Sequence, residues 1–216
     1  MALSFLASKP PLSRPSLTAD GGTEYFGGAL TLWPEKTPEG RFVSRHLLKG
    51  NSPHTGKGRE SVSTPPMHWH IHQEETLEVL SGTMCYVHAG KEGKAKKGDK
   101  VVLPPGKDHP HTFWRSTEDD EDLMIAATVT GGPNEGFCED FISNFYGYLS
   151  SVTLAKQSPS LFQMLLFLDE ADVVLSDPPF GLGRVLNVIL GRWVGGYLLG
   201  YKTRYAEFDE EGKKAK

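Results

Sequence analysis

Residues 68–75 read His68-Trp69-His70-Ile71-His72-Gln73-Glu74-Glu75, and a short apolar segment then leads to Gly82. Side chains at positions i and i+2 of a β-strand point to the same face of the sheet. His68 and His70 are therefore expected to share one face, whereas Trp69 points the other way. Two imidazoles followed by a carboxylate suit divalent transition metals. The stretch predicts a metal site on a strand and the turn that follows it.

The chain on both sides of this stretch reads as a series of short strands. Apolar runs and turn residues alternate at intervals of roughly ten residues. The apolar runs lie at 77–80, 84–87, 101–103, 112–114 and 123–129. Glycine and proline separate them, and a weaker alternation covers 23–50. This pattern predicts an antiparallel sandwich or barrel over residues 23–132.

The two ends of the chain have different compositions. Residues 1–22 are rich in Pro, Ser and Gly, which predicts a flexible N-terminal arm. After residue 132 the apolar residues recur at helical spacing, which predicts a helical C-terminal extension over 133–208 and a charged tail over 209–216. Two consecutive G-x-x-x-G patterns between Gly191 and Gly200 indicate either close packing of a helix or a dimer contact.

Composition excludes some classes of partner. The net charge is −4 and the pI is near 6.1, so the chain has no basic surplus with which to bind nucleic acid. Its two cysteines, Cys85 and Cys138, form no CxxC motif, which favours a reducing, cytoplasmic setting. No apolar run reaches the roughly 18 residues of a membrane span, so no transmembrane segment is expected.

Two motifs in the correct order resemble those of the cupin superfamily. The first has the form H-x-H, Glu and Gly, and the second has the form Gly, P-x-G and His. The matching residues are His68, His70, Glu75 and Gly82, then Gly98, Pro104, Gly106 and His109. The resemblance implies a single antiparallel cupin (jelly-roll) barrel, mainly β, with the helical extension behind it. The stretch from Ser160 to Phe208 is also similar to the tail of some fungal single-domain cupins.

The resemblance implies a metal held by three histidines and one glutamate. These would be His68, His70, Glu75 and one histidine of the second motif. His109 is favoured by its spacing from Gly106. His111 is the alternate ligand, or a residue that supports one, because the run from His111 to Trp114 looks like the sequence that often follows the family's ligand. The expected cofactor is one divalent transition metal, either Fe, Mn, Ni or Zn.

Other histidines in the chain are expected to have no part in this site. His72 is interpreted as a turn residue, and Glu74 as solvated. His46, His54 and His88 have no partner by spacing.

The resemblance further implies work on a small organic substrate of aromatic or polyketide-like character. Glu75 is the expected catalytic residue, because the family's glutamate sometimes moves a proton. Strand alternation suggests Tyr86, Phe113 and Trp114 as pocket residues. The favoured function is a dioxygenase-type oxidoreductase of secondary metabolism. The alternatives are a metal-dependent isomerase, cyclase or lyase that does not use O2, and a non-enzymatic ligand-binding cupin. A homodimer is the expected assembly.

Overall fold

The computed structural model describes residues 3–7, 9–131, 137–178 and 181–208. The chain divides into two compact units, one formed by residues 16–133 and the other by residues 1–15 together with 134–216. We call them the sheet unit and the helical unit. The predicted charged tail over 209–216 and the predicted boundary at residue 132 lie outside the described residues.

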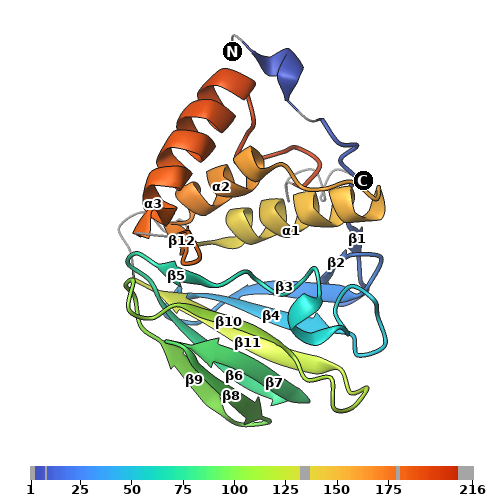
Figure 1. Cartoon of the computed structure of the whole chain (residues 1–216). Coiled ribbons are helices and arrows are strands. Elements are labelled where there is room, and N and C mark those ends of the chain that lie inside the picture. Colours follow the sequence, from blue (N-terminus) through green and yellow to red (C-terminus); the bar gives the residue numbers. More distant parts are fainter. Residues whose placement is uncertain (1–2, 8, 132–136, 179–180, 209–216) are drawn as a thin grey trace. The chain divides into compact units, whose positions relative to one another are not determined.

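The sheet unit is built from two antiparallel sheets (Figure 1). The first sheet has the strand order β1-β2-β3-β4-β11-β6-β9. Its strands are β1 (Ser16–Leu17), β2 (Thr23–Tyr25), β3 (Leu30–Lys36), β4 (Phe42–Leu48), β6 (Glu74–Ser81), β9 (Lys100–Leu103) and β11 (Leu123–Thr130). In the second sheet the neighbours are β5-β10-β7-β8. These strands are β5 (His68–His70), β7 (Thr83–His88), β8 (Lys91–Lys96) and β10 (His111–Arg115), and the short helix η2 (Gly58–Glu60) precedes them. The predicted antiparallel β architecture is confirmed.

Alternating burial shows which face of the first sheet turns inward. Along β11 every second residue is buried, beginning with Leu123 and ending with Val129. The strand lies between β4 and β6, and its Ala127 is opposite both Ser44 and Leu77. Directly opposite residues in antiparallel strands share a face. The buried side chains of β4, β6 and β11 therefore form one continuous inner surface.

Gly82 lets the chain pass from the first sheet to the second, between β6 and β7. Its φ is +75°, and a Cβ at this position would lie 2.4 Å from the carbonyl oxygen of Asp122. Only glycine adopts this conformation and permits this approach without strain. The glycine of the first motif is thus required by the backbone itself.

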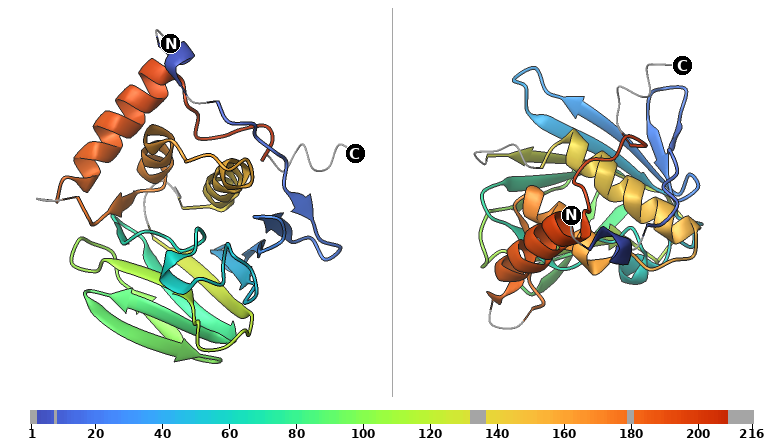
Figure 2. Two further views of the ribbon diagram at one scale, coloured as in Figure 1. Left: turned by 45° about the vertical axis from the view of Figure 1, so that its right-hand side comes forward. Right: turned by 90° about the horizontal axis from the view of Figure 1, so that it is seen from above.

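The helical unit contains α1 (Glu139–Leu154), α2 (Leu161–Glu170), the strand β12 (Val173–Leu175) and α3 (Gly183–Leu186), which continues as the π-helical segment η4 (Asn187–Leu199). The predicted helical extension is therefore confirmed. The start of the chain belongs to the same unit. The 3-10 helix η1 (Ser4–Leu6) lies beside the C-terminal end of η4, and the backbone N–H of Leu3 donates to the carbonyl of Leu198 at 3.1 Å (Figure 2).

The predicted N-terminal arm is divided between the two units. The N–H of Ser13 donates to Oγ of Ser151 at 3.0 Å, and Nη2 of Arg14 donates to the carbonyl of Ala206 at 3.3 Å. From Ser16 onward the chain joins the first sheet, where β1 pairs with β2. The flexibility of this arm stays a prediction.

The glycine pattern in η4 serves packing inside the chain. A Cβ at Gly191 would lie 2.6 Å from the backbone carbon of Leu165, and one at Gly195 would lie 2.9 Å from the carbonyl oxygen of Phe162. Both contacts are made with α2, so the glycines let the two helices approach closely. The homodimer stays a prediction. None of the described helices is both long enough and apolar enough to span a membrane. Both cysteines are free thiols.

Candidate metal centre

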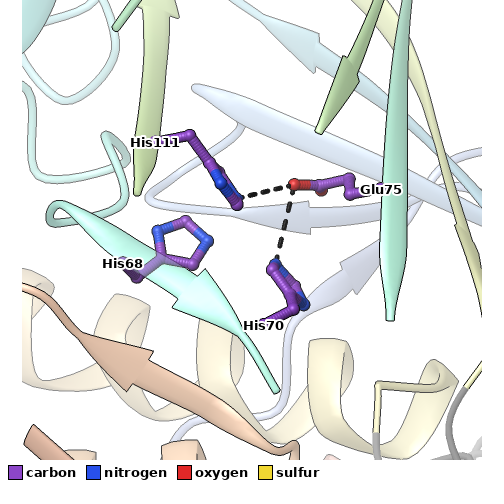
Figure 3. Close-up of side chains that lie close together, drawn as sticks. All are labelled: His68, His70, Glu75 and His111. Carbon is purple, nitrogen blue, oxygen red and sulfur yellow. Dashed lines mark ion pairs between the residues drawn. The ribbon is translucent and has the colours of Figure 1, made fainter. Parts of the chain in front are cut away.

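Four side chains of the sheet unit converge on one buried point (Figure 3). His68 and His70 come from β5, His111 from β10 and Glu75 from β6. One potential ligand atom from each residue lies within 4.8 Å of the others. Their exposed fractions are 7%, 1%, 1% and 4% in the same order. Burying a carboxylate and several imidazoles costs free energy unless they are hydrogen-bonded, paired or bound to a metal.

Strand geometry explains why these four meet. His68 and His70 are the two buried residues of β5, with Trp69 turned away between them. His111 is directly opposite His68 in the pairing of β10 with β5, so it shares their face. Glu75 reaches the cluster from the other sheet, where it shares the inner face of β6 with Leu77. The site therefore lies where the two sheets face each other.

Hydrogen bonds orient two of the imidazoles. Nδ1 of His68 donates to the carbonyl of Pro66 at 2.8 Å, and Nδ1 of His111 donates to the carbonyl of His109 at 2.9 Å. A carbonyl only accepts, so Nδ1 carries the proton and Nε2 keeps its lone pair. Nε2 of His111 lies 3.2 Å from Oε2 of Glu75, and Nε2 of His70 lies 3.7 Å from the same oxygen (Figure 3).

Burial determines the charge state of the cluster. It lowers the pKa of His68 well below its usual value, and the neighbouring His111 and His70 lower it further. Burial also lowers the pKa of His70 to about 4, although the charge of Glu75 opposes this. For Glu75, burial alone would raise the pKa, but its interactions with His111 and the other nearby imidazoles lower it to about 2. At neutral pH His68 and His70 are thus neutral imidazoles and Glu75 is a carboxylate, which are the forms that ligate metals.

The donor set fits a divalent transition metal. Three imidazoles and one carboxylate suit Fe, Mn, Ni or Zn, and four protein ligands leave positions open on a six-coordinate ion. The Nδ1–H groups of His68 and His111 donate to backbone carbonyls, and bonds of this kind fix the tautomer and the ring orientation of metal-bound histidines. His68, His70, Glu75 and His111 could therefore hold such an ion.

Comparison with known proteins places the chain in a family. The cupin domain family matches residues 60–128. A probable oxidoreductase, virH, from Hypocrea virens is 31% identical over 206 residues, which cover 93% of this chain and 92% of that protein. This chain belongs to the cupin superfamily. A probable oxidoreductase, yanE, from Aspergillus niger is 27% identical to this cupin over 215 residues, and the matched region covers 94% of this chain and 78% of that protein. Among solved structures, a cupin-like protein from Thermotoga maritima is 19% identical, covers 57% of this chain and 81% of its own, and has a TM-score of 0.36.

One ligand predicted from the sequence of this cupin needs correction. His109 was favoured as the fourth ligand, but the alternate, His111, lies in the cluster. The preference rested on the spacing of His109 from Gly106 in the second motif. The N–H of His109 instead donates to the carbonyl of Gly106 at 3.1 Å, which closes a turn before β10 begins at His111. His109 is not among the four cluster residues, and its Nδ1 lies 3.2 Å from Nε2 of His88, which is directly opposite His111 in the pairing of β7 with β10. The run from His111 to Trp114 was the signal in the sequence that pointed to His111.

The predicted pocket residues do not all share one face. Phe113 follows His111 by two residues and is directly opposite Tyr86, so both side chains lie on the face of the cluster. Trp114 is on the reverse face, where the guanidinium of Arg59 in η2 lies 5.6 Å from its ring centroid. Trp114 is therefore removed from the candidate pocket, because adjacent strand residues point in opposite directions.

Sequence reasoning missed a buried histidine on the inner surface of this cupin. His46 lies on β4 between Ser44 and Leu48, and all three are buried. Burial lowers the pKa of His46 to about 4, although the charge of Glu75 opposes the shift. The alternation of Ser44, His46 and Leu48 was the signal that could have identified it as inward-facing.

Proposed function

We propose that this cupin is a metal-dependent oxidoreductase of dioxygenase type that acts on a small, largely apolar organic molecule. The observation that supports the metal is the converging set of three histidines and one glutamate. The names of the relatives virH and yanE, both probable oxidoreductases, support the class of reaction. Glu75 and the three histidines would hold the ion, which when bound would supply Lewis acidity and a place for O2 beside the substrate.

The remaining residues set the environment of this reaction. The inner surface near Glu75 is apolar and includes Leu77, Val79 and Ile125, which are each at most 1% exposed. Such a surface favours hydrocarbon or aromatic parts of a substrate and excludes water. Tyr86 and Phe113, on the face of the cluster, add aromatic area. The lowered pKa of Glu75 keeps it ionised at neutral pH but makes it a weak base, so at a carboxylate oxygen it would accept a proton only from a strongly acidified substrate.

The first test is the metal content of protein purified without a histidine tag. The wild type should carry about one equivalent of a transition metal by mass spectrometry, and the double variant His68→Ala, His70→Ala should carry almost none. Glu75→Gln should bind the ion at least tenfold more weakly, because it removes the anionic ligand. His72→Ala is the matched control, since His72 is exposed and outside the cluster. Equal trace metal in the wild type and the double variant would refute the site.

The second test is oxygen uptake by the metal-loaded protein with a panel of phenols, flavonols and 1,3-dicarbonyl compounds. Uptake that depends on the metal and is lost in the double variant supports the oxidoreductase. Metal-dependent conversion of a substrate without oxygen uptake would contradict the oxidoreductase function and indicate an isomerase, cyclase or lyase. Metal binding without any conversion across the panel would favour a ligand-binding cupin.

A further inference from the structure

Two histidines outside the buried cluster form a pair of their own. His88 is the last residue of β7, and His109 lies in the turn before β10. Nε2 of His88 and Nδ1 of His109 are 3.2 Å apart, and the two ring planes are inclined by 32°. Both side chains are only partly buried, so water and ions reach them more easily than they reach the cluster.

The spacing of these nitrogens matches that of two ligands on one metal ion. Bonds of about 2.1 Å from imidazole nitrogen to zinc, combined with the separation of 3.2 Å, give an N–metal–N angle of about 100°. This angle lies between those of octahedral and tetrahedral coordination. We propose that His88 and His109 form a second, peripheral site for a divalent transition metal that prefers imidazole, such as Zn, Ni or Cu, with water completing its coordination.

Only a small rearrangement separates the observed pair from such a site. Without a metal, one ring donates to the other, so that a lone pair points along the line between the nitrogens. The two nitrogens and the ion form a triangle with sides of 3.2 Å between the nitrogens and about 2.1 Å from each nitrogen to the ion. In this triangle, each lone pair would have to turn by about 40° from the line between the nitrogens to point at the ion. Partly exposed side chains make such turns at low cost, because few packed neighbours resist them.

The surroundings indicate a weaker site than the buried one. The pair supplies two ligands and no anion, whereas the cluster supplies four ligands that include a carboxylate. Lys91 is directly opposite His88 in the pairing of β7 with β8, and Asp108 precedes His109. Both are exposed and opposite in sign, so solvent and salt screen their effect on the ion.

The peripheral pair is joined to the buried cluster through the backbone. The carbonyl of His109 accepts the Nδ1 proton of His111 at 2.9 Å. An ion held by the side chain of His109 would fix the residue that orients a ligand of the cluster. Peripheral binding should therefore alter affinity at the cluster, and occupancy of the cluster should alter peripheral affinity by the same factor.

The test is calorimetric titration of zinc alone into the untagged, chelator-treated full chain. The wild type should bind two equivalents, one tightly and one at least tenfold more weakly. His88→Ala and His109→Ala should each remove only the weak equivalent, while His109→Ala keeps the carbonyl that orients His111. His72→Ala should bind both equivalents. In NMR spectra of the imidazole nitrogens, the second equivalent should shift Nε2 of His88 and Nδ1 of His109.

Each result of this titration separates the peripheral site from the proposed function. Loss of the tight equivalent alone in His68→Ala, His70→Ala supports two separate sites. A wild type that binds only one equivalent, or a second equivalent that survives in both His88→Ala and His109→Ala, would overturn the peripheral site and leave the buried one standing. Binding of only the weak equivalent, lost in both single variants, would support the pair while refuting the metal centre behind the proposed function.

Discussion

Replacing His46 with glutamine should reduce the acid sensitivity of folding. Burial holds the pKa of His46 at about 4 in the folded chain, against about 6.5 in the unfolded chain. The folded state therefore binds fewer protons below pH 6.5, and each proton taken up by the unfolded chain favours unfolding. The resulting contribution to stability is complete above pH 6.5 and is lost as the pH falls towards 4. At about 1.4 kcal/mol per pH unit, the loss between pH 7 and pH 5 is about 2 kcal/mol.

The assay is urea unfolding of metal-free protein, followed by tryptophan fluorescence at pH 7 and pH 5 and constant ionic strength. The wild type should lose about 2 kcal/mol more folding free energy between these values than His46→Gln does. Glu75 does not interfere, because its pKa of about 2 keeps it ionised throughout. His72→Gln, which alters an exposed histidine, should behave as the wild type does. If His46→Gln loses as much free energy as the wild type, His46 is not a buried neutral imidazole.

The helical unit allows two matched comparisons by urea unfolding. Gly191→Ala should destabilise the protein by about 2 kcal/mol through overpacking against Leu165. Gly196→Ala should be neutral or stabilising, because its Cβ would meet nothing closer than 3.7 Å. Equal effects of the two substitutions would contradict the packing of η4 on α2. Asp169→Asn should cost about 2–3 kcal/mol because its buried carboxylate accepts from Arg184 and Arg192. The exposed neighbour variant Glu170→Gln should stay within about 0.5 kcal/mol of the wild type, and an equally silent Asp169→Asn would show that the buried ion pairs contribute nothing.

Three of the four cluster residues could be predicted from the sequence, His68 and His70 from strand geometry and Glu75 from its place in the motif that resembles the cupin superfamily. His68 and His70 share a face through the two-residue period of a strand, and Gly82 marks the turn that ends the strand carrying Glu75. The strand and turn pattern likewise gave the antiparallel architecture. These features depend on neighbours in the chain, so the sequence carries them directly.

The remaining features depend on contacts between distant residues. The choice between His109 and His111 required the position at which the turn after Gly106 becomes β10. Trp114 was misplaced because two adjacent residues were assigned to one face of the same strand. His46 is buried by the register of β4 with β11, which spans residues far apart in the sequence. Local signals existed for each of these residues, but the position of the turn and the register of the paired strands decide which of those signals holds.

The attachment of the first residues to the helical unit has a consequence for biosynthesis. Leu3, Ser13 and Arg14 find their hydrogen-bond partners at Leu198, Ser151 and Ala206, near the other end of the chain. At ribosomal rates of about 5–20 residues per second, the start of the chain waits on the order of ten seconds or longer for those partners. The sheet unit is continuous in sequence and is complete earlier. The segment that contains Leu3, Ser13 and Arg14 therefore docks only after residues 151–206 have been made, which is later than the completion of the sheet unit.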